Sequence, residues 1–227
     1  MFGANPIRKQ ELRQDGELWV QEIFRTIQGE GPLAGRPAVF IRLSGCNLAC
    51  KFCDTEFESG RMLHWRHVVQ EAASLAPGRW PEALFVITGG EPFRQDIREM
   101  VDCLITYYGD VQIETAGTLW LNALPPEAQL VVSPKTGKLN QEIINRAKYY
   151  KYIIRDGEIG DDGLPNVMPT GVAGDVARPP AGSVVYLQPC DDHDSHRNMN
   201  NLRAARDVAL HFGYRLSIQQ HKILELP

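Results

Sequence analysis

Three cysteines in one short segment constrain this chain more than any other feature of its sequence. Cys46, Cys50 and Cys53 lie in CNLACKFCDT, residues 46–55, and are separated by three residues and then by two. Thiolates so close together on one loop suit a common metal centre, and soft thiolate ligands favour iron–sulfur clusters, zinc or copper(I). A complete four-iron cluster or structural zinc site normally has four protein ligands. A centre with three leaves one metal position open, and an open position is where chemistry takes place.

Two other uses of these cysteines remain open on the residues alone. A zinc site needs a fourth ligand, which His64 or His67 could supply, although the spacing fits neither of the usual paired-cysteine zinc patterns. A disulfide is disfavoured, because the polar N-terminus lacks the apolar core of a signal peptide and no segment approaches the ~20 apolar residues of a membrane span. We therefore expect a cytoplasmic protein, in which cysteines bind metals more often than they form disulfides.

Length and charge predict one globular domain that acts on a small molecule. The chain has 227 residues, of which 43% are hydrophobic and 23% charged, as in an ordinary globular protein. We expect a single domain over residues 1–227, with residues 1–17 as an N-terminal extension. The net charge of −4 argues against a basic nucleic-acid surface. Neither a nucleic acid nor a membrane is therefore expected as a partner.

Apolar runs that alternate with amphipathic segments predict strands followed by helices. Runs such as PAVFIRL and LFVIT are nearly continuously apolar, which is typical of strands buried on both faces of a parallel sheet. Asp15-Gly16 is a turn pair that could close a hairpin between residues 7–13 and 17–24. The predicted strands span residues 19–27, 37–43, 84–88, 111–115, 130–133, 149–154, 184–187 and 215–218, and the predicted helices span residues 64–75, 97–105, 139–148 and 201–212.

This alternation predicts an α/β fold with βαβ units and a parallel sheet. A complete (β/α)8 barrel needs eight units in ~250 residues, whereas this chain has about six parallel strands and fewer helices. We therefore expect a partial, open TIM-type barrel with reduced helices. Ligands of such folds bind at the carboxyl ends of the strands. The cysteine loop and four further segments follow predicted strand ends and should form one site: residues 88–91, 114–115, 133–135 and 188–191.

Two polar regions lie in the second half of the chain. Residues 160–183 are rich in Gly, Pro and Asp, lack either periodicity and are long for a connection, so we expect an irregular loop that could act as a lid. Residues 191–196 contain three aspartates and two histidines, a set that looks like metal ligands. The pattern favours instead a solvated acidic loop that caps the last helix.

A glycine-rich turn and one arginine each allow two interpretations. The turn Gln28-Gly29-Glu30-Gly31 is either a plain connection between strands or a polar loop that faces a ligand. Arg42 interrupts an apolar strand just before the cysteine loop, so it is either paired within the fold or directed into a site. Because a guanidinium group binds carboxylates through two hydrogen bonds, the second interpretation predicts a carboxylate substrate.

The cysteine spacing resembles the cluster loop of the radical S-adenosylmethionine (SAM) enzymes, whose 4Fe-4S cluster binds SAM at its open iron. Several motifs together resemble one of their families, the 7-carboxy-7-deazaguanine synthases of deazapurine and queuosine biosynthesis. The match runs from about Glu22 to Pro227. Its pieces are TIQGEG (26–31), GRPAVFIRLSGCNLACKFCDT (35–55), VITGGEP (86–92), IETAGT (113–118), VVSPK (131–135), LQPCD (187–191) and RLSIQQHK (215–222).

The resemblance implies the partial barrel of the radical SAM kind and a lyase reaction. In that family, 6-carboxy-5,6,7,8-tetrahydropterin is converted to 7-carboxy-7-deazaguanine by hydrogen abstraction and ring contraction, with loss of ammonia. The implied cofactors are a 4Fe-4S cluster, SAM and Mg²⁺. The implied partners are the small-molecule pterin, an external flavodoxin-like or ferredoxin-like one-electron reductant, and a second copy of the chain in a homodimer.

The resemblance also implies roles for particular residues. Cys46, Cys50 and Cys53 would bind the cluster, and Thr55 would coordinate Mg²⁺ through its hydroxyl. The implied SAM contacts are Phe52, Cys53, Asp54, Gly90, Ser133, Pro134, Lys135, Gln188, Pro189, Cys190 and Asp191. The implied substrate contacts are Ile27, Gln28, Gly29, Arg42, Thr88 and the carboxylate of Pro227, with Glu30 and His221 as neighbours.

Two departures from the family pattern and two competing functions bear on this interpretation. Cys190 stands where the family has a methionine, and QQHK stands where it has QTHK. The competing functions are another radical SAM enzyme, such as a glycyl-radical activase, and a non-catalytic zinc-binding protein. The TIQGEG turn and Arg42 favour the synthase over the activase.

Overall fold

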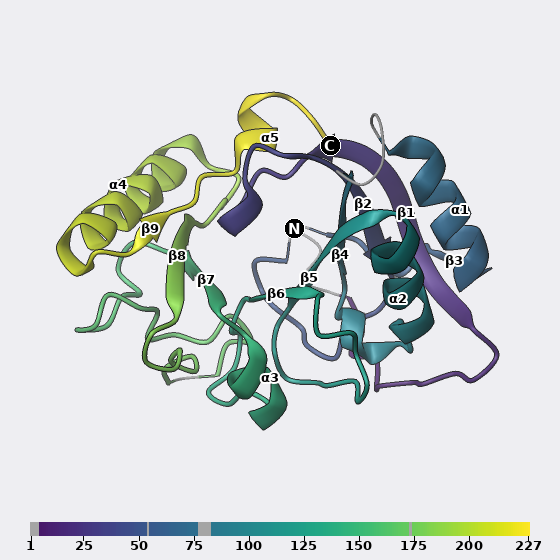
Figure 1. The fold of residues 1–227 in the computed structure, drawn as a ribbon. Helices are drawn as coiled ribbons and strands as arrows, with labels where there is room; N and C mark the ends of the chain where they lie inside the picture. Colours follow the sequence, from purple (N-terminus) through teal and green to yellow (C-terminus); the bar gives the residue numbers. More distant parts are fainter. Residues whose placement is uncertain (1–4, 54, 77–82, 173) are drawn as a thin grey trace.

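One open sheet organises the structure, a computed structural model that describes residues 5–53, 55–76, 83–172 and 174–227 (Figure 1). Within those residues nine strands lie in the order β3-β1-β2-β4-β5-β6-β7-β8-β9. The strands are β1 Glu17–Ile27, β2 Pro37–Leu43, β3 Arg61–His64, β4 Ala83–Gly89, β5 Gly109–Thr115, β6 Gln129–Val132, β7 Tyr149–Ile154, β8 Val184–Pro189 and β9 Arg215–Leu216. The helices are α1 Trp65–Leu75, α2 Arg98–Tyr107, α3 Gln141–Arg146, α4 Ser195–Phe212 and α5 Gln220–Ile223, with 3-10 turns η1 Gly31–Leu33 and η2 Pro92–Arg94.

The pairing confirms the predicted α/β fold with a partial, open barrel. Strands β2, β4, β5, β6, β7, β8 and β9 run parallel in that order, and β9 contributes only two residues. Strand β1 pairs antiparallel with both β2 and β3. Because β3 and β9 lie at opposite ends of the strand order, the sheet of the described residues is open.

The two-residue period of the strands gives the sheet two different faces. On β2, Val39 and Ile41 point to the large core beneath the helices, whereas Ala38 belongs to a small cluster on the other face, with Leu84 and Val86 of β4. Arg42 and its register partner Thr88 follow on that second face. The apolar runs are therefore buried on both faces, as predicted, but one face turns polar where the strands end.

The helices cover the face of the sheet that carries the large core. Helix α1 packs against β1 and β2, α2 against β5, and α4 against β7, β8 and β9. In Figure 1 helices α1 and α2 lie together beside one end of the sheet and α4 beside the other. The first turn of α4 is capped by the Asp194 carboxylate, which accepts a hydrogen bond from the Arg197 amide at 2.8 Å. This cap supports the interpretation of residues 191–196 as an acidic capping loop.

Helix α4 begins at Ser195, six residues before the predicted start. Its first turns, SHRNMN, are polar and lack the apolar period that marks a helix in a sequence. The Asp194 cap instead satisfies the exposed amides that begin any helix. Helix α3 is shorter than predicted, at Gln141–Arg146.

The predicted hairpin at Asp15-Gly16 is wrong. The segment before that turn crosses the cysteine loop instead of pairing with β1: Ile7 forms a parallel bridge with Cys46, and the Arg8 amide donates to the Cys46 carbonyl at 2.7 Å. Strand β1 pairs on that side with β3, Arg61–His64, which the sequence did not indicate. The N-terminal extension therefore braces the cysteine loop.

The segment after β9 lies across the open side of the sheet and contacts β1. Helix α5 packs against β1, and the Gln220 amide donates to the Gly29 carbonyl at 3.2 Å. A side chain at Gly29 would begin 2.2 Å from His221 Nδ1, so only glycine permits this approach. Ser217 Oγ also accepts a hydrogen bond from the Gly31 amide at 2.9 Å. The glycine-rich turn is thus a packing surface for the end of the chain.

The connection between β7 and β8 contains no helix or strand in its described part. Arg178 holds it together through an ion pair with Asp162 at 2.6 Å and a hydrogen bond to the Pro165 carbonyl at 2.8 Å. The Pro169 carbonyl accepts a hydrogen bond from the Lys51 amide at 2.9 Å, so this connection touches the middle of the cysteine loop. A role as a lid stays a prediction.

Two buried tyrosines on β7 provide a test of the packing. The Tyr152 hydroxyl donates to the Ala177 carbonyl at 2.8 Å, whereas the buried Tyr150 hydroxyl has no partner among the described residues. Tyr152→Phe should lower the free energy of unfolding by ~0.5–1.5 kcal/mol, because it removes a hydrogen bond. Tyr150→Phe should leave it unchanged or raise it. Chemical denaturation of the two variants measures the difference, and equal destabilisation of both would contradict the described packing.

Candidate active site

A cavity of about 280 Å³ lies where the parallel strands end. Its wall is formed by the last residues of β1, β2, β4, β5 and β8 and the loops that follow them. The loop after β6, two residues within β7, the segment after β9 and Asn5 complete it. This is the edge where the ligands of such a sheet are expected. The volume is close to the lower end of the range for small-molecule sites.

The cavity brings together nearly all of the residues that the sequence singled out. Its lining includes Cys46, Cys50, Phe52, Cys53, Thr55, Gly90, Ser133, Lys135, Gln188, Pro189, Cys190, Asp191, Ile27, Gln28, Glu30, Arg42, Thr88, His221 and Pro227. Gly29 and Pro134 lie beside it without lining it; Pro134 lines a small neighbouring cavity. Asp54 is outside the described residues. Which ligand each residue contacts stays a prediction.

The three thiols share one part of the wall, in a loop held from two sides. The N-terminal segment fixes the Cys46 carbonyl, and Asn5 Nδ2 donates to the Thr55 carbonyl at 2.9 Å. Burial raises the pKa of Cys46 to about 12, and the nearby Glu91 charge adds to this effect. Burial also raises the pKa of Cys50, against the opposing charge of Lys135. Because metals bind thiolates, loading this site must release protons.

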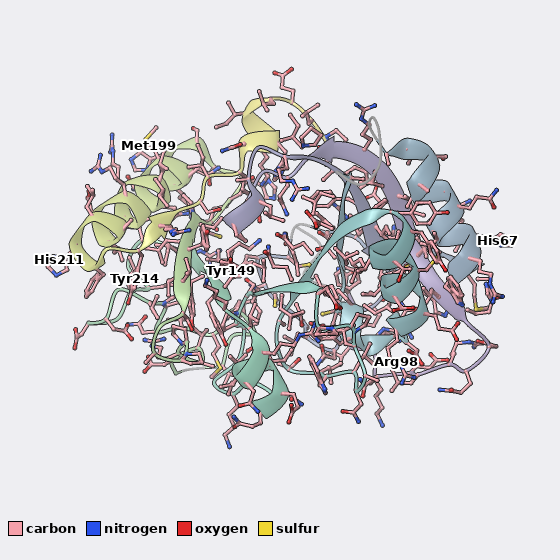
Figure 2. All side chains as sticks on the ribbon, in the orientation of Figure 1. His67, Arg98, Tyr149, Met199, His211 and Tyr214 are labelled. Atoms are coloured by element: carbon pink, nitrogen blue, oxygen red, sulfur yellow. The ribbon has the colours of Figure 1, made fainter. Side chains whose placement is uncertain are left out.

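The donor set fits a soft metal centre that has one open side. Three thiols of one loop line the cavity, and Cys190, which also lines it, comes from the loop after β8 and lies beside Arg155. Among the described residues, no three His, Cys, Asp or Glu side chains stand close enough together to hold an ion. His64 Nδ1 accepts a hydrogen bond from the Arg66 amide, and exposed His67 lies on the outer side of α1 (Figure 2). Neither histidine lines the cavity, so neither lies where the fourth zinc ligand suggested by the sequence would have to be.

Gln188 gives an independent indication that a ligand fits next to the cysteines. Its side chain lies at the end of β8, lines the cavity and is only 6% exposed. Its Oε1 atom is buried and has no hydrogen-bond partner among the described residues. A buried acceptor without a donor is costly. A ligand that carries N–H or O–H groups would satisfy it, and the ammonium and hydroxyl groups of SAM have that chemistry.

Phe52 and Cys190 lie on the side of the cavity that faces the β7–β8 connection. Lys135 Nζ stands 5.5 Å and Arg155 Cζ 5.8 Å from the centre of the Phe52 ring. Arg155 also approaches the Cys190 sulfur at 3.6 Å and pairs with Asp192 at 2.5 Å. Cys190 therefore fills a packed, charged corner, and burial raises the pKa of its thiol to about 11.

Glu91 is a cavity residue whose role the sequence did not reveal, although GGEP marked its loop. It is 1% exposed, and its carboxylate accepts hydrogen bonds from Thr115 Oγ1 at 2.7 Å, the Ala116 amide at 2.9 Å and the Phe93 amide at 3.1 Å. Burial raises its pKa despite these three donors. The side chain joins the loop after β4 to the loop after β5 and so fixes the wall next to Cys46.

Arg42 is paired within the fold and also lines the cavity, so the structure contains both of the arrangements that the sequence left open. It pairs with Glu22, its partner in the β1–β2 register, at 3.0 Å, and its guanidinium lies 5.3 Å from the centre of the Phe24 ring. The same side chain lines the cavity beside Thr88. A carboxylate ligand would therefore meet a guanidinium that is already oriented by one ion pair.

A buried charge cluster forms another part of the wall. Lys151 of β7 lies between the carboxylates of Glu30 and Glu114, and Gln28 and Gln219 donate to those carboxylates. The sequence indicated Glu30 only as a neighbour, placed Glu114 in the site only as part of the segment 114–115, and did not indicate Lys151. The signal was available for Lys151, since it interrupts the apolar run YYKYII just as Arg42 interrupts PAVFIRL.

An open parallel barrel with a three-cysteine loop after its first parallel strand defines an enzyme of the radical SAM class. No protein-family model matches the chain. It is 43% identical over the whole of both chains to the 7-carboxy-7-deazaguanine synthase of Rhodospirillum rubrum. It is 39% identical to that of Rickettsia prowazekii, over 99% of this chain and 95% of the other. The chain belongs to the 7-carboxy-7-deazaguanine synthase family.

A solved structure shows the same fold at lower sequence identity. The crystal structure of QueE from Escherichia coli superposes with a TM-score of 0.67 over 89% of this chain and 94% of that chain, at 24% identity. At this sequence identity the likeness is evidence for the fold and not for the function. It supports the partial barrel. The activase and zinc-protein alternatives are not favoured by these relatives.

The Glu91 carboxylate yields a test of how the site is held. Thr115→Val removes a donor to that carboxylate and the acceptor of the Gly117 amide while keeping the side-chain shape. We expect the free energy of unfolding to fall by ~1–3 kcal/mol, because buried polar groups lose their partners. Thr106→Val on the exposed side of α2 is the matched control and should change little. Equal unfolding free energies for both variants would contradict the proposed link between the two loops.

Proposed function

We propose that the chain converts 6-carboxy-5,6,7,8-tetrahydropterin to 7-carboxy-7-deazaguanine with loss of ammonia. The observation that carries this proposal is one cavity that joins three cysteine thiols to a wall of buried charged and amide side chains. Full-length relatives with this name support it. A glycyl-radical activase acting on a protein would have no use for such a buried polar wall.

The thiol part of the cavity is where we place the cofactors. Bound there, the 4Fe-4S cluster and SAM supply a radical that abstracts hydrogen from the substrate. Cys46, Cys50 and Cys53 would hold the cluster. The proposed SAM contacts are Phe52, Cys53, Gly90, Ser133, Lys135, Gln188, Pro189, Cys190 and Asp191, together with Asp54 and Pro134. Gln188 has the clearest physical reason, its buried acceptor atom.

The polar wall is where we place the pterin. Arg42 would bind its carboxylate through two hydrogen bonds, and Thr88 lies next to it in register. Ile27, Gln28 and Glu30 come from the turn after β1, with Gly29 behind them. The terminal segment contributes His221 and Pro227, whose oxygen accepts a hydrogen bond from Thr26 at 2.9 Å. These contacts would orient the ring and exclude water from it.

Thr55 is the proposed protein ligand of Mg²⁺. It lines the cavity two residues beyond Cys53, and a hydrogen bond from Asn5 Nδ2 to its carbonyl fixes its backbone. A hydroxyl is a hard oxygen ligand, and Mg²⁺ commonly keeps waters and substrate oxygens as its remaining ligands. The ion would supply positive charge beside the substrate oxygens.

The proposed setting follows from the same chemistry. The reaction needs an external one-electron reductant of the flavodoxin or ferredoxin type, and the family resemblance suggests a homodimer. All five cysteines are free thiols, which suits a reducing compartment such as the cytoplasm. Among the described residues, no helix is long and apolar enough to cross a membrane. We propose neither a nucleic acid nor a membrane as a partner.

Anaerobic turnover tests the function directly. Purified protein should contain iron and sulfide and should form 7-carboxy-7-deazaguanine from the pterin with SAM, Mg²⁺ and a reductant. Changing Cys46, Cys50 and Cys53 together to Ala should abolish iron binding and the formation of 5′-deoxyadenosine. Cys103→Ser on α2, outside the cavity, is the matched control and should retain both. Zinc in place of iron in the parent protein, or SAM cleavage by the triple variant, would overturn the proposal.

Arg42→Lys tests the carboxylate site. Lysine keeps the charge but lacks the planar group that binds a carboxylate through two hydrogen bonds. Losing one such bond costs ~1.5–3 kcal/mol, so KM for the pterin should rise by about one to two decades. Arg36→Lys, at the Asp110 ion pair away from the cavity, is the control and should not change KM. An unchanged KM with lower stability in Arg42→Lys would make Arg42 structural.

A further inference from the structure

Strand β7 carries a lysine where a sheet normally carries apolar side chains. Lys151 is 6% exposed, and its neighbours in sequence, Tyr150 and Tyr152, belong to the large core. The two-residue period of the strand therefore turns Lys151 and Ile153 to the opposite face, where both line the cavity. A lysine is almost never buried without a partner of opposite charge. Its partners here are two carboxylates, one in the turn after β1 and the other near the end of β5.

Two carboxylates meet the Lys151 ammonium group. Glu30 Oε2, from the turn after β1, forms a short ion pair with it, and Glu114 Oε2 of β5 lies 3.2 Å away. The side chains of Glu30 and Glu114 are 12% and 16% exposed, and both line the cavity. Two acidic groups and one basic group leave this buried cluster with one net negative charge.

Amide side chains complete the cluster and orient the carboxylates. Gln219 donates to Glu30 Oε1 at 2.8 Å. Gln28 and Gln112 donate to Glu114 Oε1 at 3.0 and 3.2 Å. A carboxylate offers about four positions for hydrogen bonds. The described residues use two of them on Glu30 and three on Glu114, so both groups retain capacity for a donor from the cavity.

We propose that Lys151 is a positioning residue that keeps Glu30 and Glu114 together as ionised acceptors, so that this wall binds a ligand ring through its N–H groups. The inference rests on the proposed function, since a pterin ring carries such N–H donors. Lys151 itself need not touch the ligand. Its effect passes through the two carboxylates, which a neutral residue at position 151 could not hold in the same state.

Electrostatic interactions explain why the two carboxylates need Lys151 between them. Burial by itself raises the pKa of Glu30, but the Lys151 charge and hydrogen bond outweigh it, so the pKa lies below its usual value. Burial by itself lowers the pKa of Lys151, but Glu114 and Glu30 outweigh it and the pKa lies above its usual value. Two neighbouring carboxylates without the cation repel each other, which favours the protonated form of one of them. One would take a proton and become a donor, which opposes an N–H group of the ligand.

His221 is the other titratable group that faces this cluster. It lies on α5, lines the cavity and contributes charge at Glu30. The groups that set the charge here are therefore Glu30 from the β1 turn, Glu114 from β5, Lys151 from β7 and His221 from α5. Because every variant keeps His221, the effect of His221 on the pH dependence of the Kd also appears in the parent protein and can be subtracted.

The test compares Lys151→Met with the parent holoenzyme and with Lys148→Met. Lys148 is exposed just before β7 and lies outside the cavity, so its variant makes the same chemical change without touching the cluster. Equilibrium dialysis measures pterin binding between pH 6 and 9, and steady-state turnover separates KM from kcat. At pH 7 we expect Kd and KM to rise about 10- to 100-fold in Lys151→Met, as for a lost charge-assisted hydrogen bond. Lys148→Met should match the parent.

The pH profile separates positioning from general damage to the fold. In Lys151→Met a carboxylate that has taken up a proton loses it as the pH rises, so the Kd should fall back toward the parent value. The parent should not show this fall in Kd, because its Lys151 ammonium group lies between the two carboxylates. The double variant Lys151→Met/Glu30→Gln removes the repulsion between the two carboxylates, because the amide at position 30 carries no charge. It should recover the thermal midpoint of the parent but keep a raised Kd at every pH, because one acceptor has become an amide.

Two results would overturn the inference. One is a Kd for Lys151→Met within twofold of the parent. The other is a raised Kd whose pH profile matches that of the parent, which would make Lys151 a structural residue only. Failure of the proposed function looks different, because the parent protein would then make no 7-carboxy-7-deazaguanine from the pterin. A parent that turns over while Lys151→Met behaves identically would refute only the role of Lys151.

Discussion

Parallel pairing from β2 to β8 is the constraint on which the site depends. A parallel register brings every carboxyl end to one edge of the sheet, and the two-residue period sends alternate side chains to one face. Arg42 and Thr88 are register partners on that face, and Lys151 reaches the cavity from β7 while its neighbours enter the core. A shift of one residue in β7 would exchange Lys151 for a tyrosine. The chemistry of the wall is thus fixed by strand register.

Segments far apart in the sequence hold one another around the cavity. The turn after β1 and the segment after β9 hold each other through the Gly29 carbonyl and Ser217 Oγ. The N-terminal segment and the β7–β8 connection hold the cysteine loop at Cys46 and Lys51. These contacts hold the loop in its place on the sheet at its first cysteine and in its middle.

Buried charge is concentrated at the cavity, and each charged group there is compensated. Glu91 has three donors, Arg42 has Glu22, and Lys151 has two carboxylates. Uncompensated burial of any of them would be strongly unfavourable. Gln188, whose Oε1 atom has no partner among the described residues, and Glu30, which retains acceptor capacity, both line the cavity. At the cavity, such incompletely satisfied groups indicate where a ligand fits.

The sequence by itself determined the strands β1, β2 and β4 to β9, the open α/β barrel and the segments that meet at its edge. These follow from local patterns: apolar period, turn residues and cysteine spacing. Only the tertiary structure decided that residues 5–11 brace the cysteine loop instead of forming a hairpin, that β3 exists, and that His64 caps a helix instead of approaching the thiols. It also decided the partners of Lys151. Each of these depends on contacts between residues distant in sequence, whose energies no local pattern records.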